Sequence, residues 1–271
     1  MLRGFAAYHR DKMKQLRIRA RRMFRGRFGN VSNGVILYEG PSQLDPSQDI
    51  VVIATGLNRP SKNDKTDDMI QVWILLQDVA PTKANQQGLD VAVCGDCKHR
   101  QWQRQPNGSM AKVGSCYVVL HKAPLSVYKA YKRGNYPWLD PESARELLRD
   151  TWVRFGAYGD PSAVPVHIWE PIRDVVRKYT GYTHQWRNLG PEWHWLMASV
   201  DTPAERLEAM RMGWRYFRVK GEDDELFDNE QVCASEARGT SCAACGLCAG
   251  MSTAKAKSQV ITVHGVFAGN F

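Results

Sequence analysis

Cysteine is the residue whose spacing in this 271-residue chain points most directly to chemistry. Seven cysteines form a group of three and a group of four, at Cys94, Cys97 and Cys116 and at Cys233, Cys242, Cys245 and Cys248. Cysteines separated by two residues let neighbouring thiolates turn onto one metal ion or cluster. The N-terminus lacks the apolar segment of a secretory signal, which favours reduced, metal-binding cysteines over a disulfide framework. We therefore expect a metal-binding protein of the cytoplasm.

The four-cysteine group has the spacing C-x8-C-x2-C-x2-C. Its last three members have the spacing found at the core of bacterial ferredoxin ligation, and Cys233 is the natural fourth ligand. Four thiolates close the coordination sphere of a metal centre. We expect a structural or electron-carrying site here, and the spacing allows both zinc and an iron–sulfur cluster.

The three-cysteine group leaves one coordination position vacant. In a zinc site, His99 or His121 would complete the tetrahedron. In a [4Fe–4S] cluster, one iron would stay open for a substrate or cofactor. The alternative interpretation is a redox pair formed by Cys94 and Cys97, with Cys116 buried as a small apolar side chain.

Strand and helix signals alternate along the chain that must position these groups. Strands are expected over 49–57, 69–78, 153–159, 181–186, 194–201, 214–219 and 259–265. Helices are expected over 124–134, 140–152, 166–180 and 202–213, with Asp140 and Thr202 as N-caps. The alternation predicts an α/β fold with parallel strands and right-handed crossovers. A complete or partial parallel β/α barrel with a C-terminal cysteine-rich loop at 233–250 is the first expectation, and a doubly wound open sheet is the second.

Polar side chains at the carboxyl ends of the expected strands would line the catalytic face of such a barrel. The candidate catalytic residues are Asp160, His184, Gln185, Asp201 and Arg218, and Ser199 and His264 occupy similar positions. Asp160 is equally a turn or N-cap residue, and His184 is equally a core histidine. Arg218 lies within an apolar strand, where a buried guanidinium needs an anionic partner from the protein or from a ligand.

The net charge of +9 resides in the first 27 residues, where ten Lys or Arg side chains are opposed only by Asp11. This asymmetry predicts a basic N-terminal arm over 1–30, followed by a single β/α domain over 31–271. The arm would contact nucleic acid, folding against the polyanion. A disordered leader is the alternative. No segment approaches 18 uninterrupted apolar residues, so no membrane span is expected.

Several short segments are similar to those of known proteins. They are "SKNDKT" at 61–66, the C-x2-C … CYV element at 94–118, "GAYGDP" at 156–161, "YTHQW" at 182–186, "MASVD" at 197–201, "GWRYFRV" at 213–219, and the terminal cysteines with "VHG" at 263–265. Over about residues 50–265 the chain resembles uncharacterised phage and plasmid proteins of radical-SAM-like architecture. The resemblance implies a β/α barrel, a cluster held by Cys94, Cys97 and Cys116, an auxiliary cysteine site, and a location in the host cytoplasm. Radical-SAM enzymes usually carry C-x3-C-x2-C in one short loop, whereas Cys116 lies 19 residues beyond Cys97.

Three functions agree with these features. The first is an enzyme with an open iron–sulfur centre, which could use S-adenosylmethionine, acting on a nucleotide or nucleic acid. In it, Asp160, Gln185, Asp201 and Arg218 would hold the cofactor or the substrate. The second is a zinc-stabilised nucleic-acid-binding protein without catalysis, whose arm contacts phosphates. The third is a scaffold whose metal centres only hold the fold.

Overall fold

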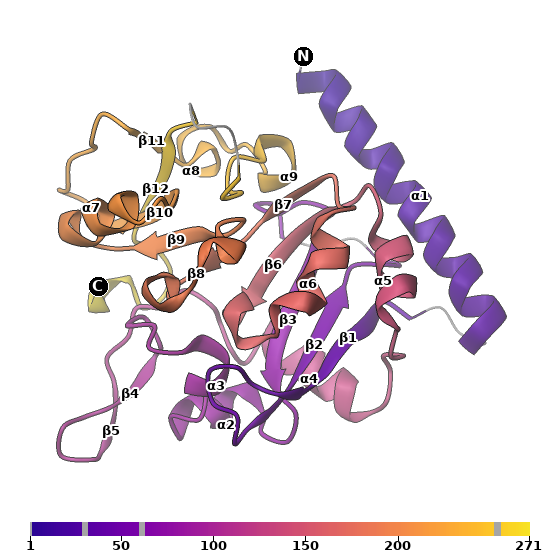
Figure 1. Cartoon of the computed structure of the whole chain (residues 1–271), viewed down its shortest axis with the longest axis horizontal. Coiled ribbons are helices and arrows are strands. Elements are labelled where there is room, and N and C mark those ends of the chain that lie inside the picture. The colour runs from indigo at the N-terminus through magenta and orange to yellow at the C-terminus, as the bar shows by residue number, and fades with distance from the viewer. Residues whose placement is uncertain (1, 29–31, 60–62, 252–255) are drawn as a thin grey trace.

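The computed structural model describes residues 2–28, 32–59, 63–251 and 256–271. These residues form a mixed α/β structure with two five-stranded sheets, a two-stranded ribbon and surrounding helices (Figure 1). The predicted α/β class with parallel strands is confirmed. Residues 1, 29 and 30 of the predicted arm, and residues 61–62 of the "SKNDKT" segment, lie outside the described residues.

The first sheet has the order β1-β2-β3-β6-β7. Its strands are β1 Gly34–Pro41, β2 Asp49–Thr55, β3 Ile70–Leu76, β6 Trp152–Tyr158 and β7 Lys178–Thr180. The first three strands pair antiparallel, whereas β3, β6 and β7 pair parallel. Every residue of β3 is buried, as expected for a strand covered on both faces. The meander strand β1 was not predicted from the sequence.

The second sheet has the order β11-β12-β10-β9-β8, and all its strands pair parallel. Its strands are β8 Tyr182–Thr183, β9 Met197–Val200, β10 Tyr216–Lys220, β11 Glu230–Val232 and β12 Ser258–Thr262. Only Gly181 separates β7 from β8, so one stretch of chain passes directly from the first sheet into the second. The strands of the described residues do not close into a complete barrel, because β1 and β11 remain as edges.

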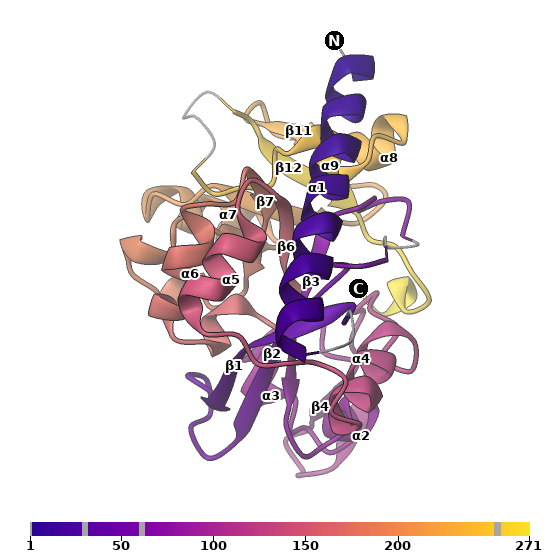
Figure 2. The same ribbon diagram turned by 90° about the vertical axis from the view of Figure 1, so that its right-hand side faces the viewer.

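Helices cover the sheets and carry the connections between strands. They are α1 Leu2–Phe28, α2 Pro81–Gln86, α3 Val91–Cys94, α4 Ala123–Lys132, α5 Pro141–Leu148, α6 Val166–Arg173, α7 Pro203–Arg211, α8 Ala234–Arg238 and α9 Cys242–Cys245. Short 3-10 turns occur at Pro161–Ala163, Trp186–Asn188, Pro191–Trp193 and Ala268–Asn270, and the ribbon pairs β4 Trp102–Arg104 with β5 Met110–Lys112. In the side view, α5 and α6 lie on one side of the first sheet and α2 and α4 on the other (Figure 2).

The predicted helix starts are confirmed by their caps. The Asp140 side chain accepts a hydrogen bond from the Ser143 amide at the start of α5. Thr202 and Glu205 form a capping box at the start of α7. The helix expected over 166–180 ends at Arg173 instead, and residues 178–180 form β7. Pro171 removes a helix-stabilising amide near that end, which explains the early stop.

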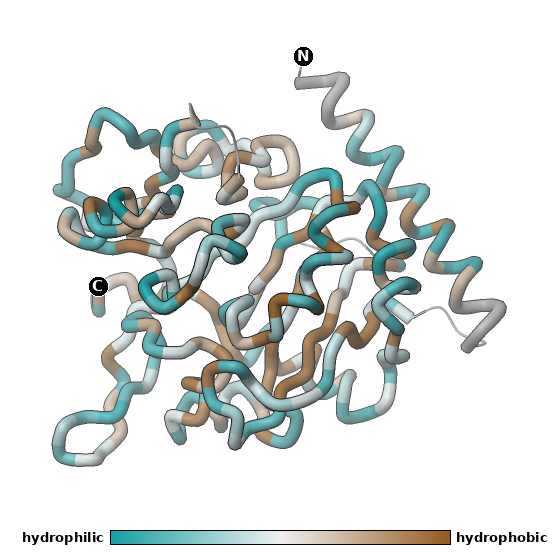
Figure 3. Tube along the Cα trace, viewed as in Figure 1, coloured by the Kyte–Doolittle hydropathy of each residue, from teal (hydrophilic) through white to brown (hydrophobic). Residues whose placement is uncertain are grey.

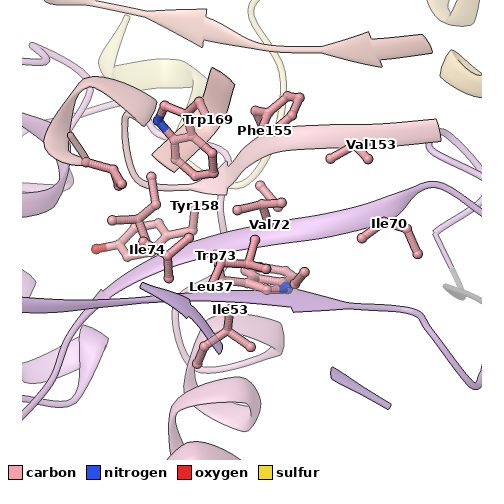
Figure 4. Close-up of a cluster of buried hydrophobic side chains, with 14 of the residues drawn as sticks. Leu37, Ile53, Ile70, Val72, Trp73, Ile74, Val153, Phe155, Tyr158 and Trp169 are labelled. Carbon is pink, nitrogen blue, oxygen red and sulfur yellow. The ribbon is translucent and has the colours of Figure 1, made fainter. Parts of the chain in front are cut away.

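The hydrophobic core lies against the first sheet, where the brown segments of the hydropathy trace concentrate (Figure 3). Val72 of β3 and Phe155 of β6 project from one face of this sheet, whereas Ile53 of β2 projects from the other face (Figure 4). Trp169 of α6 packs edge-on against Phe155, with 5.3 Å between ring centroids. Each fully buried side chain of this size stabilises the fold by about 1.5–3 kcal/mol.

The basic N-terminal segment is a helix that docks on the body of the protein. Met13, Leu16 and Ala20 recur at helical spacing and are fully buried. Lys12 Nζ lies 2.5 Å from an Asp150 carboxylate oxygen, and Arg19 donates to two carbonyls at the end of α5. The basic segment is therefore a helix packed on the domain, rather than the disordered leader that was the alternative expectation.

Candidate functional site

One cavity of about 430 Å³ lies against the parallel strands of both sheets. Alternate strand residues line it, namely Arg154, Gly156 and Tyr158 of β6, Thr180 of β7, Tyr182 of β8, Ser199 of β9, Phe217 and Val219 of β10, and Ile261 of β12. Because alternate residues of a strand share a face, these residues show that each sheet turns one face toward the cavity. The passage through Gly181 joins the sheets into this shared wall.

The three-cysteine group lies at this cavity, beside the loop that follows β6. Cys94 ends α3, and the Asp160 amide donates to the neighbouring Val93 carbonyl at 2.6 Å. The β4–β5 ribbon then folds the chain back, and the Cys116 amide donates to the His99 carbonyl at 2.8 Å. Cys94, Cys97 and Cys116 all line the cavity and interact electrostatically with one another. The ribbon thus compensates for the long spacing between Cys97 and Cys116.

The four-cysteine group contributes Cys233, Cys242 and Cys248 to the same cavity. Cys233 and Cys245 interact electrostatically with both Cys242 and Cys248, so all four residues are neighbours. Gly246 ends α9 in the left-handed region with φ 68, which a residue with a side chain rarely adopts. A Cβ there would also lie 2.9 Å from the Lys178 side chain. The sequence-predicted cysteine-rich loop is therefore folded tightly against β7.

Positive charges surround the four-cysteine group. Lys65 and Arg154 are within electrostatic reach of Cys242, Lys178 of Cys245, and Arg215 of Cys248. Arg215 also donates to the Leu247 carbonyl at 3.3 Å and to the Ala249 carbonyl, and the Cys242 amide donates to the Lys65 carbonyl at 2.7 Å. Four cations around four thiols match the net negative charge of a metal centre ligated by four thiolates.

Carboxylates surround the three-cysteine group instead. The negative charge of Asp90 raises the pKa of Cys94 and Cys116, and the charges of Asp160 and Asp201 raise the pKa of Cys97. Arg100 pairs with buried Asp90 at 2.9 Å and reduces this negative field. The two groups therefore lie in electrostatically different ends of one cavity.

Burial raises the pKa of the thiols in both groups. This holds for Cys94, Cys97, Cys116, Cys242 and Cys248, and neighbouring cysteines add to the effect at Cys94, Cys97, Cys242 and Cys248. A reactive redox cysteine needs a lowered pKa, which the N-terminus of a helix or a nearby cation provides. Cys94 lies at the C-terminal end of α3. The arrangement thus suits thiols that lose their protons to a bound metal better than a redox pair.

Zinc and an iron–sulfur cluster use thiolate ligands differently. Four thiolates at about 2.3 Å from one tetrahedral zinc lie about 3.8 Å apart. In an iron–sulfur cluster, each thiolate binds a different iron. Among the described residues, two groups have three ligand atoms all within 4.8 Å of one another, and both consist of histidine and aspartate.

Three of the predicted catalytic residues belong to the cavity or its supports. Asp160 lines the cavity and accepts hydrogen bonds from the Ser162 and His184 amides, at 3.0 and 2.8 Å, so it also shapes the turns after β6 and β8. His184 lines the cavity, and burial lowers its pKa to about 4, which keeps the imidazole neutral. Asp201 does not line the cavity but accepts from the His99 ring at 2.9 Å.

The other two lie behind the cavity wall. Gln185 is buried, and its amide nitrogen lies 3.5 Å from the Cys94 carbonyl oxygen. Arg218 is paired with Glu230, whose carboxylate oxygens lie 2.8 and 2.7 Å from Nε and Nη2. The anionic partner expected for this guanidinium is therefore a residue of the protein.

Of the two histidines considered as a fourth ligand, His99 lines the cavity with the three cysteines, and its Nδ1 lies 2.6 Å from Ser115 Oγ. His121 is exposed and lines a separate pocket. Ser199 and His264, the two secondary candidates, both line the main cavity.

Sequence reasoning missed two cavity residues of β6. Arg154 donates to the Tyr117 hydroxyl at 2.5 Å and faces the four-cysteine group. The Tyr158 hydroxyl lies beside Cys94, and burial together with that thiol raises the pKa of Tyr158. Period-two alternation within 152–158 places both residues on one face, and this signal was sufficient to find them.

No protein-family model, curated protein or solved structure matches this chain.

Proposed function

We propose that this protein is an iron–sulfur enzyme whose reaction takes place in the cavity between its two cysteine groups. The observation that carries the proposal is that both groups open into one cavity lined by parallel strands. A protein in which the metal centres only held the fold would have no need to place both beside the same hollow space. Cavities of this size are typical of small-molecule and cofactor sites.

A partial β/α barrel is the architecture we propose for this enzyme. The parallel strands β3, β6 and β7 continue through Gly181 into β8, β9 and β10, in the order of the chain. Residues of β6, β7, β8, β9 and β10 face the cavity, as the inward-facing residues of a barrel do. This arrangement agrees with the radical-SAM-like resemblance of the sequence.

The three-cysteine group would hold a [4Fe–4S] cluster with one open iron. Cys94, Cys97 and Cys116 are partly buried, line the cavity together and interact electrostatically with one another. Such a cluster supplies one-electron chemistry, which S-adenosylmethionine or another small cofactor bound at the open iron would use. Tyr158 and Arg100 border this end of the cavity, where they exclude water and balance the charge of Asp90.

The four-cysteine group would hold a second, saturated metal centre. The charges of Lys65, Arg154, Lys178 and Arg215 support a centre with net negative charge at this position. A saturated centre offers no position for substrate, so its role is structural or electron-carrying. Arg154 lies between this centre and the cavity, where its guanidinium would orient an anionic part of the substrate, such as a phosphate.

The proposed substrate class is a nucleotide or a nucleic acid. Arg10, Lys14 and Arg22 of α1 are exposed, while the apolar side of the helix is buried. An exposed basic stripe on a docked helix suits contacts with phosphates. No helix in the described part of the chain combines the length and apolar character of a membrane span. We propose the cytoplasm of a phage or plasmid host as the location, following the resemblance.

Anaerobic elemental analysis tests the proposal. We expect iron and acid-labile sulfide in the purified protein, and loss of one centre with retention of the other in Cys116→Ala. Cys248→Ala is the matched variant, because it should lose the other centre. Survival of both centres in Cys116→Ala would show that the three-cysteine grouping is wrong.

The second candidate function is a zinc-stabilised nucleic-acid-binding protein without catalysis, and the basic stripe of α1 is the observation that favours it. A colourless protein with about two zinc ions per chain would replace the enzyme proposal by this one.

Charge substitution tests the nucleic-acid role in both cases. The quantity measured is the slope of the logarithm of the nucleic-acid binding constant against the logarithm of the salt concentration. Each phosphate contact contributes about 0.9 to the size of this slope. The triple variant Arg10→Gln, Lys14→Gln and Arg22→Gln should therefore reduce it by about 2.7. The control replaces three exposed lysines outside α1, namely Lys83, Lys122 and Lys129, by glutamine. Equal slopes for the two triple variants would remove the role assigned to α1.

A further inference from the structure

Three metal-ligating side chains converge outside both cysteine groups, at the rim of the cavity. They are His99, His184 and Asp201, and their ligand atoms all lie within 4.8 Å of one another. His99 follows the Cys94–Cys97 turn, His184 follows β8, and Asp201 follows β9. The fold therefore brings together three separate parts of the chain at one point.

The geometry of two of these residues already matches a metal site. His99 Nε2 lies 2.9 Å from Asp201 Oδ1. Two ligands at right angles, each about 2.1 Å from one metal ion, lie about 3.0 Å apart. The other ring nitrogen of His99 lies 2.6 Å from Ser115 Oγ. A second partner of this kind fixes the tautomer and the ring orientation of a ligating histidine.

The third residue has a buried nitrogen that no described residue satisfies. His184 Nε2 is buried and has no hydrogen-bond partner among the described residues. Its ring lies 5.6 Å from the His99 ring, measured between centroids. Buried polar atoms are nearly always paired, so an unpaired imidazole nitrogen in a cluster of ligands points to a missing partner. A cation between the rings would supply it.

The surrounding charges favour a divalent cation. His184 lies within electrostatic reach of three carboxylates, those of Asp96, Asp201 and Glu205. The neighbouring cations are Lys98, 3.1 Å from Asp201, and Arg187, 3.6 Å from Glu205. Both cationic side chains are about half exposed, at 49% and 42%, and Arg187 also pairs with Glu208 at 2.8 Å, so both can move away from the site when a metal ion takes their place. Asp201 itself is only 4% exposed and stays in position.

We infer that His99, His184 and Asp201 form a mononuclear site for a divalent first-row transition metal, separate from both cysteine groups. Two imidazoles and one carboxylate suit manganese, iron, cobalt or zinc, whereas thiolates select softer metals and clusters. Both histidines line the cavity, so the remaining coordination positions face the same space as the cysteines. An oxygen atom of a substrate or water would complete the site there. The inference does not rest on the proposed iron–sulfur function.

Titration with Mn²⁺ tests the site, because Mn²⁺ prefers nitrogen and oxygen ligands to thiolates. The full chain, purified anaerobically with its cysteine centres intact, is titrated while free Mn²⁺ is measured by electron paramagnetic resonance. We expect about one Mn²⁺ per chain, and a loss of affinity of at least about tenfold in His184→Gln and in Asp201→Asn. His264→Gln is the control, since His264 lines the cavity outside the three-residue cluster.

Two Mn²⁺-binding results would overturn the inference. One is wild-type protein that binds no Mn²⁺, and the other is His184→Gln with wild-type affinity. The iron content of each variant is measured in parallel, and loss of Mn²⁺ with retention of iron supports a separate site. If His184→Gln loses its iron, then His99→Gln and Asp201→Asn decide the question. Loss of iron and Mn²⁺ together in all three variants would show that the site is not separate.

Discussion

The buried pair of Arg218 and Glu230 tests which polar residues build the fold rather than the cavity. Arg218 Nε and Nη2 donate to the Glu230 carboxylate at 2.8 and 2.7 Å, and the two side chains are 1% and 0% exposed. The same carboxylate accepts from the Tyr216 hydroxyl at 3.1 Å and the Phe227 amide at 3.0 Å. Glu230→Gln keeps the shape of the side chain and removes its charge, so the only remaining counter-charge near buried Arg218 among the described residues is the half-exposed Asp224 carboxylate, 3.9 Å away.

The expected loss follows from the burial of both partners. Removing one partner of a buried ion pair costs about 3–5 kcal/mol of unfolding free energy. In a domain of this size, each kcal/mol lowers the Tm by about 2–4 °C, so Glu230→Gln should lower the Tm by about 6–20 °C. Urea and thermal unfolding of the anaerobic protein measure the change. Glu222→Gln is the matched control, because Glu222 is exposed and its substitution should cost less than about 0.5 kcal/mol.

Neither residue of the pair lines the cavity, so the iron content should be unchanged in Glu230→Gln protein that is still folded. A cost below about 1 kcal/mol would refute the assignment of Arg218 to the fold. Loss of iron without loss of stability would refute it as well, because it would connect the pair to the metal centres.

Three further outcomes are expected. Burial alone would raise the pKa of Glu230, but the hydrogen bonds from Arg218 hold it below its ordinary value of 4.5. The ionised Glu230 therefore contributes its full stabilisation above pH 4.5, and this contribution is lost as the pH falls below 4.5. Urea midpoints measured at several acidic pH values should accordingly decrease less steeply with falling pH in Glu230→Gln than in the wild type. Leu16→Ala should lower the unfolding free energy by about 2–5 kcal/mol if α1 is docked, whereas an undocked helix would lose less than about 0.5 kcal/mol. Gly114→Ala should cost the protein the proposed three-cysteine centre, because a Cβ there, two residues before Cys116, would lie 1.9 Å from the Arg100 carbonyl oxygen, while Gly269→Ala, with no atom within 4 Å, should keep its iron.

The helix starts and the inner strands were predictable from local sequence. Asp140 and Thr202 cap α5 and α7 because a cap needs only a side-chain oxygen and amides within the next three residues. The strands over 49–55 and 70–76 follow from continuous runs of apolar residues. The end of α6 was mispredicted, because pairing of residues 178–180 with β6 outweighed the helical signal around them.

The two tight cysteine spacings were likewise visible in the sequence, since two intervening residues suffice to turn one thiol toward the next. Their shared cavity was not. The meeting of Cys116 with Cys94 and Cys97 depends on the β4–β5 ribbon, and the meeting of both groups depends on strands from two sheets.

The long-range polar contacts also had to come from the tertiary structure. His99 and Asp201 are 102 residues apart in the chain and 2.9 Å apart in space. The sequence around Arg218 predicted a buried guanidinium with an anionic partner, but it did not show whether that partner was a ligand or Glu230. The residue types by themselves showed that thiol side chains and charged groups were present. Packing of α1, the sheets and the loops decided which of them are neighbours, because contact between distant residues is fixed by the burial of the elements that carry them.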